Sequence, residues 1–272
     1  MKIDPSALVE PVRLIAQCAS QRILAIYSAG FSVTHKADCS PLTEADMAAH
    51  EAIVAGLTDL DPTIPVLSEE DADITLAERS RWEWLWLVDP LDGTREFIKQ
   101  NDEFCINIAL IHGHEAVFGL ILIPITGVCY FGYRHGGAYK QLPDRSPMAI
   151  CTRRVDDRPI RVVGSRSYRG RPLQTYLEYL VHYDYLAIGS ALKSCLVAEG
   201  QVDIYPRFGP TSEWDTAAAQ IILEEAGGYL TDTFMKPLRY NARPTLINPD
   251  FLAFGDPRHD WSQYLPRRKP GY

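Results

Sequence analysis

Eighteen consecutive residues without a charged side chain, AVFGLILIPITGVCYFGY at 116–133, constrain the fold of this chain more than any other stretch. A run of this length is just long enough to cross a membrane as a helix. Pro124 and Gly127 fall in its middle, however, and Val, Ile, Tyr and Phe dominate its flanks. Because these residues break helices and favour strands, the run predicts two buried β-strands joined by a turn and not a membrane span.

Strand-like segments surround this run and predict one large sheet in the first half of the chain. The expected strands are residues 64–67, 84–88, 106–111, 116–123, 128–133 and 138–141. Two helices are expected to precede the sheet strands. Apolar residues recur at helical spacing over 5–29, and the stretch from Thr43 to Asp46 has the form of a capping box that opens a second helix to about Leu57. The first half therefore predicts an α+β arrangement.

The pattern changes after about residue 150, where strand-like and helical segments alternate. The expected strands are 160–165, 183–189 and 202–206, and the expected helices are 171–181, 190–198 and one from about Asp215 to Gly227-Gly228. Alternation of this kind predicts an α/β second half. Since no low-complexity linker separates the halves, we expect two closely packed domains, residues 1–152 and 153–272.

Net charge and cysteine usage exclude several classes of protein. The net charge of −8 argues against nonspecific binding to nucleic acid or to anionic lipid. A small anionic substrate would need a local cation, either a bound metal or a few placed Lys and Arg side chains. The six cysteines form no C-x-x-C pair, and the N-terminal residues have no apolar core typical of a signal peptide. We therefore expect a reducing, cytoplasmic location.

The stretch WLVDPLDGTREF at 86–97 places two aspartates at the end of an apolar run. A tight turn after a buried strand is the simple interpretation. Pro90 stiffens the bend, however, so that Asp89 and Asp92 can both point to one side. Gly93 permits close backbone approach, and Thr94 can start a short helix whose amides suit a phosphate.

Three further acidic residues occur where strands end or helices begin. Glu69 follows the short strand at 64–67, Asp46 lies in the first turn of a helix, and Asp215 opens another helix. Taken singly, these residues are explained as helix caps or as an acidic loop. Taken together with the two aspartates of the turn, they predict a site for two or more Mg²⁺ ions, since Mg²⁺ prefers oxygen ligands.

Three motifs carry a resemblance to a known family: S-E-E at 68–70, D-P-L-D-G-T at 89–94 and W-D-T-A-A at 214–218. They resemble the lithium-sensitive, magnesium-dependent phosphomonoesterases that include inositol monophosphatase and fructose-1,6-bisphosphatase. Longer stretches, such as GSALKSCLVAEGQVDIYPRFGPTSEWDTAA at 189–218, are similar to bacterial 3′(2′),5′-bisphosphate nucleotidases, and the similarity extends to about Pro249. The resemblance implies an α/β fold, a layered α-β-α-β-α sandwich of the inositol monophosphatase and sugar phosphatase type. The first domain would hold the metal site, and the second would complete the active site and the nucleotide pocket.

The resemblance also implies roles for individual residues. The metal ligands would be Glu69, Asp89, Asp92 and Asp215, with the carbonyl of Leu91. The substrate would contact Glu69, Leu91, Asp92, Gly93, Thr94, Ser190, Lys193, Arg207 and Asp215. The catalytic residues would be Asp46, Glu69 and Thr94, of which Asp46 and Thr94 orient and activate the attacking water. The family often has a histidine after S-R-S where this chain has Tyr168, so the role of that histidine is not carried over.

The implied activity is hydrolysis of the 3′-phosphate of adenosine 3′,5′-bisphosphate to AMP and phosphate by metal-activated water. Inositol monophosphatase or sugar phosphatase activity is the alternative within the superfamily. Lys193 and Arg207 favour a substrate with a second anionic group, unless they are ordinary surface charges. A catalytically silent metal or phosphate sensor is a more distant alternative, because a binder would not need the residues that activate water.

The resemblance has further implications for the protein in the cell. It implies sensitivity to lithium and a part in sulfur assimilation. The protein is expected in the cytoplasm, either free or peripheral at the inner face of the cell membrane. It would act as a monomer or homodimer on a small nucleotide bisphosphate, with no nucleic-acid partner and no transmembrane segment.

Overall fold

Two main β-sheets organise this computed structural model, which describes residues 3–35, 41–156, 158–166 and 170–266. The larger sheet has seven strands in the order β3-β4-β5-β6-β7-β8-β9. Its strands are β3 (Val66–Ser68), β4 (Trp84–Asp92), β5 (Cys105–His112), β6 (Glu115–Leu122), β7 (Cys129–Tyr133), β8 (Gly137–Gln141) and β9 (Met148–Ile150). The order follows the chain, and every neighbouring pair is antiparallel except β3 and β4.

The smaller sheet has five strands in the order β11-β10-β12-β14-β13. Its strands are β10 (Ile160–Ser165), β11 (Tyr183–Ile188), β12 (Ile204–Arg207), β13 (Tyr229–Asp232) and β14 (Phe251–Phe254). Strand β10 runs parallel to both β11 and β12. The expected alternation of strands and helices in the second half is therefore confirmed at these elements. A separate pair, β1 (Val33–His35) and β2 (Pro41–Thr43), lies outside both sheets.

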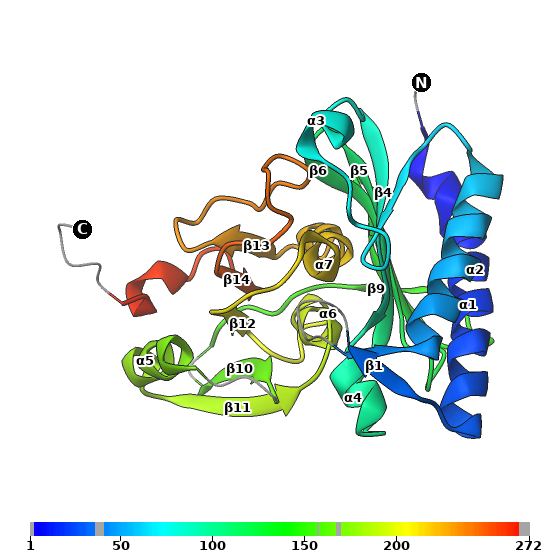
Figure 1. Ribbon diagram of the computed structural model, residues 1–272. Helices are drawn as coiled ribbons and strands as arrows, with labels where there is room; N and C mark the ends of the chain where they lie inside the picture. Colours follow the sequence, from blue (N-terminus) through cyan, green and yellow to red (C-terminus); the bar gives the residue numbers. More distant parts are fainter. Residues whose placement is uncertain (1–2, 36–40, 157, 167–169, 267–272) are drawn as a thin grey trace.

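Helices cover both sheets and fill the space between them (Figure 1). The helices are α1 (Val9–Ala29), α2 (Glu44–Leu60), α3 (Leu76–Arg79), α4 (Thr94–Ile98), α5 (Arg171–Leu180), α6 (Leu192–Ala198) and α7 (Glu213–Glu225), with 3₁₀ turns η1 (Pro5–Leu8) and η2 (Trp261–Tyr264). Helices α1 and α2 pack on the outer face of the large sheet, α6 and α7 lie between the sheets, and α5 covers the outer face of the small sheet. This order confirms the expected α-β-α-β-α sandwich.

Strand β4 shows why the apolar run at 84–88 is buried on both sides. Leu85 and Leu87 point into the core shared with α6 and α7, and Trp86 and Val88 point into the core under α1 and α2. Period-two alternation puts successive side chains on opposite faces, so a strand between two helical layers must be apolar throughout. The first of these cores contains residues from both halves of the chain. The domain boundary between residues 152 and 153 stays a prediction.

The uncharged run at 116–133 forms β6 and β7, as expected. The two strands pair from Phe118 opposite Tyr133 to Leu122 opposite Cys129. Glycines at 119 and 132 bring α7 onto the sheet, because a Cβ atom on Gly119 would lie 2.5 Å from the carbonyl oxygen of Ala218. No helix in the described part of the chain is both long and apolar enough to cross a membrane.

Some element boundaries differ from the sequence prediction. The first helix begins with a 3₁₀ turn at Pro5, the strand expected at 84–88 continues to Asp92, and the helix expected from Ser190 begins at Leu192. Several short elements were not predicted, namely β1, β2, β9, α3, β13, β14 and η2. Their length explains this, since three or four residues are too few to show a hydrophobic period.

Candidate active site

The end of β4 builds the first part of the site. Asp89 pairs with Asn107 of β5 and Asp92 pairs with Cys105, with an irregular register between them where the D-P-L-D turn interrupts the strand. Asp89 is 1% exposed, and its carboxylate accepts the backbone N–H of Leu91 at 3.1 Å. The chain then turns at Gly93, whose φ of 98° lies in the left-handed region, and enters α4. The aspartates therefore lie on a rigid turn inside the sheet and not on a surface loop.

Asp46 lies behind this turn and contacts Thr94. It is the third residue of helix α2 and forms a capping box with Thr43, whose backbone N–H donates to the Asp46 carboxylate at 2.7 Å. Its other oxygen accepts the hydroxyl of Thr94 at 3.1 Å. Asp46 thus caps a helix and also touches a predicted catalytic residue, so the two interpretations of this aspartate do not compete. Burial raises the pKa of Asp46, against the hydrogen bonds from Thr43 and Thr94.

Asp215 and Glu69 come from two other elements. Asp215 is the third residue of helix α7 and forms a capping box with Ser212, whose backbone N–H donates to the Asp215 carboxylate at 2.9 Å. Helix α7 starts at Glu213, two residues before the predicted start. Glu69 directly follows β3, and its N–H donates to the carbonyl of Val88 at 3.0 Å. Pairing of β3 with β4 therefore places Glu69 beside the turn that carries Asp89.

One cavity of about 520 Å³ collects most of the predicted metal-site residues. Its lining includes Glu69, Asp89, Leu91, Asp92, Gly93, Thr94 and Asp215. Asp46 is absent from the lining and reaches it through Thr94. Among the residues that the structure describes, no group of three or more His, Cys, Asp or Glu side chains is already arranged to hold a metal ion. The acidic groups thus share a cavity without closing around one point.

Burial is the main influence on the ionisation of these carboxyl groups. Burial, followed by the charge of Glu69, raises the pKa of Asp89 well above its ordinary value. Burial and the charge of Asp92 do the same to the pKa of Asp215, and burial raises the pKa of Asp92. Like charges in a buried site disfavour ionisation unless a cation is added. The donor set, carboxylates with one backbone carbonyl, fits a hard cation such as Mg²⁺, which also takes water and phosphate oxygens.

A second cavity of about 160 Å³ adjoins the first. Its lining includes Ser165, Ser190, Ala191, Lys193, Tyr205, Arg207 and Phe251. The two cavities share five lining residues: Asp92, Gly93, Glu96, Thr211 and Asp215. The structure therefore brings the predicted substrate residues Ser190, Lys193 and Arg207 beside the acidic cavity, on elements of the second half of the chain.

Lys193 lies closer to the acidic residues than its position in the sequence suggests. It is 5% exposed, its ammonium donates to the carbonyl of Ser190, and it lies 5.1 Å from the centre of the Tyr205 ring. Burial lowers its pKa, against the attraction of Asp92. Arg207 is held differently, by a bond from its guanidinium to the carbonyl of Pro210 at 2.9 Å. Lys193 and Asp92 line the same cavity and attract each other electrostatically, so a change at Lys193 would affect Asp92 as well as a bound substrate.

Three groups around Asp92 were not predicted. One oxygen of its carboxylate accepts the N–H of Ala191 at 2.5 Å and the amide of Asn107 at 3.4 Å, and the thiol of Cys105 lies 3.8 Å away. The sequence held one indication of these contacts, the polar Asn107 within the otherwise apolar strand CINIALI. Tyr168, which replaces the family histidine, lies outside the described residues.

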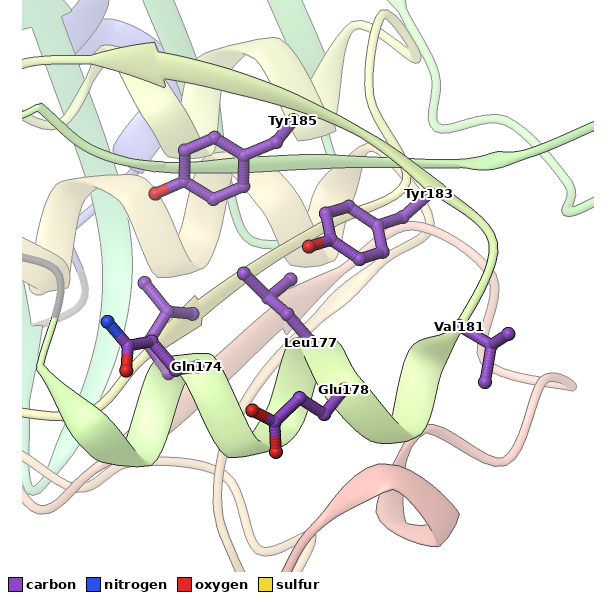
Figure 2. Close-up of a pocket in the computed structure, with 7 residues that line it drawn as sticks. Gln174, Leu177, Glu178, Val181, Tyr183 and Tyr185 are labelled. Carbon is purple, nitrogen blue, oxygen red and sulfur yellow. The ribbon is translucent and has the colours of Figure 1, made fainter.

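A third cavity lies away from all of these groups. It measures about 640 Å³ and is lined by residues of α5 and β11. Figure 2 shows the rings of Tyr183 and Tyr185 extending from β11 above α5, where Leu177 and Glu178 line the other side. Its lining, taken from the described part of the chain, includes the carboxylate of Glu178 and no cationic side chain, so these residues do not suit a phosphate.

The comparisons with known proteins agree with this geometry. A family model described as the inositol monophosphatase family matches residues 6–258. The chain belongs to this family. A family match over this range covers both sheets and every element that lines the two cavities.

Individual members of the family narrow the relationship. A relative from Escherichia coli O157:H7, named 3′(2′),5′-bisphosphate nucleotidase CysQ, is 44% identical over 247 residues, or 90% of this chain and 98% of that protein. The relative of the same name from Haemophilus influenzae is 38% identical over 93% of this chain and 95% of that protein. The crystal structure of CysQ from Bacteroides thetaiotaomicron matches with a TM-score of 0.76 at 40% identity, over 89% of this chain and 94% of that chain. The predicted resemblance and fold class are thereby confirmed.

Proposed function

We propose that this protein is a Mg²⁺-dependent nucleotidase that hydrolyses the 3′-phosphate of adenosine 3′,5′-bisphosphate to AMP and phosphate. One observation carries the proposal: a carboxylate-lined cavity adjoins a cavity lined by Lys193 and Arg207, and the two share Asp92 and Asp215. The first cavity suits metal ions and a phosphate, and the second suits another anionic group on the same molecule. The name of the curated relatives supports the same substrate class.

In this proposal the acidic cavity holds two or more Mg²⁺ ions. The ligands would be Glu69, Asp89, Asp92 and Asp215 with the carbonyl of Leu91, all of which line the cavity. Bound Mg²⁺ would supply a Lewis acid for the phosphoryl group and lower the pKa of a water molecule. Gly93 and Thr94 line the same cavity and would lie against the scissile phosphate.

Thr94 and Asp46 would orient the attacking water. The hydroxyl of Thr94 donates to Asp46, so its lone pairs are free to accept a hydrogen bond from a water in the cavity. Asp46 is held in turn by both the N–H and the hydroxyl of Thr43, at 2.7 and 2.6 Å. Because burial raises the pKa of Asp46, its carboxylate is a better proton acceptor than an exposed aspartate. Glu69, on the other wall, would complete the catalytic set.

Steady-state kinetics test the proposal directly. We expect kcat/KM for adenosine 3′,5′-bisphosphate to exceed that for inositol 1-phosphate and fructose 1,6-bisphosphate, with activity lost in EDTA and restored by Mg²⁺. A preference for either of the other substrates would replace the nucleotidase with the matching inositol or sugar phosphatase. If the protein hydrolyses no phosphomonoester, the remaining hypothesis is a catalytically silent sensor of metal or phosphate.

The finer expectations of the resemblance belong to the same proposal: inhibition by lithium, a part in sulfur assimilation, and a cytoplasmic location, free or at the inner membrane face. Lithium is the simplest to check, since a small hard cation can replace a weakly held Mg²⁺ in an oxygen-lined site. Equal rates in LiCl and in matched NaCl would remove this part of the proposal.

A further inference from the structure

Glu103 joins the two halves of the chain beside the active site, although it lines neither cavity. Its carboxylate accepts the backbone N–H of Gly189 at 2.8 Å. The same carboxylate accepts two bonds from the guanidinium of Arg166, at 2.6 and 3.1 Å. The side chain of Glu103 is 17% exposed, and that of Arg166 is 49% exposed. Glu103 is thus a largely buried acceptor whose partners lie 63 and 86 residues further along the chain.

The turn that Glu103 holds leads directly to Asp92. After Gly189, Ser190 adopts a φ of 49°, in the left-handed region that a residue other than glycine rarely occupies. The next residue, Ala191, donates its N–H to the carboxylate of Asp92 at 2.5 Å. A strained backbone of this kind persists only when the surrounding contacts determine it. The bond from Gly189 to Glu103 is one such contact, immediately before the strained residue.

The backbone of Glu103 also fits tightly between the two turns. A Cβ atom on Gly189 would lie 2.8 Å from the carbonyl oxygen of Glu103, and a Cβ atom on Gly93 would lie 2.9 Å from the same oxygen. Gly93 follows Asp92, and Gly189 precedes Ser190. The residue at 103 therefore lies between the turn that carries the acidic groups and the turn that carries a predicted substrate contact.

We propose that Glu103 is a positioning residue for Asp92 and Ser190. By accepting the N–H of Gly189, it holds the turn at 189–191 in the conformation that directs the Ala191 N–H onto Asp92 and keeps Ser190 at the second cavity. This inference rests on the proposed function in one respect, the assignment of Asp92 as a Mg²⁺ ligand. Groups that orient a metal ligand typically change metal affinity 10- to 100-fold when they are altered.

A carboxylate near a cation site could also act simply through its charge, and two substitutions separate these roles. Glu103→Asp keeps the charge but withdraws the carboxylate by one methylene from Gly189. Glu103→Gln keeps an acceptor of the same length but removes the charge. Positioning predicts that the Mg²⁺ dissociation constant rises about tenfold in Glu103→Asp and stays within about threefold of wild type in Glu103→Gln.

Titration calorimetry with MgCl₂ on the whole protein without substrate gives the first measurement. The Mg²⁺ concentration for half-maximal hydrolysis of adenosine 3′,5′-bisphosphate gives the second. Glu115→Gln is the matched control, because it weakens two arginine contacts at 2.7 Å on the opposite end of the same sheet. We expect this control to leave the Mg²⁺ dissociation constant unchanged.

Three results would overturn the inference. They are an unchanged dissociation constant in Glu103→Asp, an equal loss in Glu103→Asp and Glu103→Gln, and the same loss in the Glu115→Gln control. Failure of the proposed function looks different. The wild type would then leave the bisphosphate intact, while the calorimetric difference between the Asp and Gln variants would still stand.

Discussion

The two ends of the large sheet treat acidic side chains in opposite ways. At one end, where β4 stops and α7 begins, Asp89 is buried and Asp92 and Asp215 are half-buried beside the same cavity, and the pKa values of all three are raised. At the other end, where β6 begins, Glu115 contacts Arg134 and Arg239, each at 2.7 Å. Among the described residues, no arginine forms an ion pair with Asp89, Asp92 or Asp215, whereas Glu115 at the opposite end of the sheet is paired with two arginines.

This difference indicates which cluster can act on a ligand. Carboxylates paired with arginine are already compensated, and at an exposed site such pairs add little stability. Glu225, at the far end of α7, is likewise satisfied by the N–H groups of His135 and Gly137, both at 2.8 Å. Buried carboxylates that repel one another cost stability until a cation arrives. If the acidic end binds a metal as proposed, the cation would relieve this repulsion, whereas Glu115 and Glu225 already have partners within the fold.

The largest contrast should appear when one acid at each end is neutralised. We expect Asp89→Asn and Asp92→Asn to lower Mg²⁺-dependent kcat/KM by on the order of 10³-fold or more, because a metal contributes several kcal/mol to such a reaction. Glu115→Gln should leave kcat/KM near wild type. Circular dichroism would establish that all three variants fold. Near wild-type turnover in either asparagine variant would mean that these aspartates only shape a turn, for which asparagine is also well suited.

A smaller effect should separate the two cationic residues of the second cavity. We expect Arg207→Ala to lower kcat/KM for adenosine 3′,5′-bisphosphate by about 10- to 150-fold and to affect adenosine 3′-monophosphate little, as a contact to the second phosphate requires. Lys193→Ala should reduce turnover of both substrates, because Lys193 also faces Asp92.

Parallel kinetics on the two nucleotides provide the measurement. If Arg207→Ala lowers kcat/KM equally for both substrates, Arg207 serves the reaction centre or folding. The hypothesis of a bisphosphate substrate would then lose its main support among the residues. A Lys193→Ala variant that affects only the bisphosphate would show that the electrostatic attraction between Lys193 and Asp92 has no bearing on metal binding.

The smallest effect concerns stability and pH without divalent cations. A carboxyl group whose pKa is raised by folding binds more protons in the native state than in the unfolded state. The free energy of unfolding therefore falls as the pH rises above the pKa of the unfolded aspartate, which is about 4. We therefore expect the Tm of the wild type in EDTA to fall more steeply from about pH 4 toward neutrality than that of Asp89→Asn. The difference between the two Tm profiles isolates Asp89. Parallel profiles would show that burial does not perturb this group.

Much of the fold followed from local patterns. The strands at 160–165 and 106–111 were predictable because apolar, β-branched residues run between turn signals. The capping box at Thr43 was also readable, since its two members lie three residues apart. Predictions of this kind succeed because the interaction lies within a few residues of the chain.

Motifs predicted the site residues, but the sequence did not predict the partners that lie far from them along the chain. Glu103 lies in a polar run and gives no signal that Gly189, 86 residues away, will donate to its carboxylate. Lys193 reads as a helical lysine, and only the packing of α6 against β12 buries it near Asp92. Chain separation hides such contacts, because no local period or spacing encodes them.

The two glycines that face α7 have a consequence for how this sequence can vary. With no side chain at Gly119 or Gly132, the helix rests on the strand backbone itself, and a Cβ atom on Gly132 would already lie 3.0 Å from the Cα of Ile222. Any larger residue at either position would push α7 away from the sheet and would displace Asp215, which lies in the first turn of the same helix. The residues tolerated at these two positions are therefore limited by Asp215, which lies within about two helical turns of both contacts on α7. The uncharged stretch that shapes the sheet thus also helps to position a carboxylate.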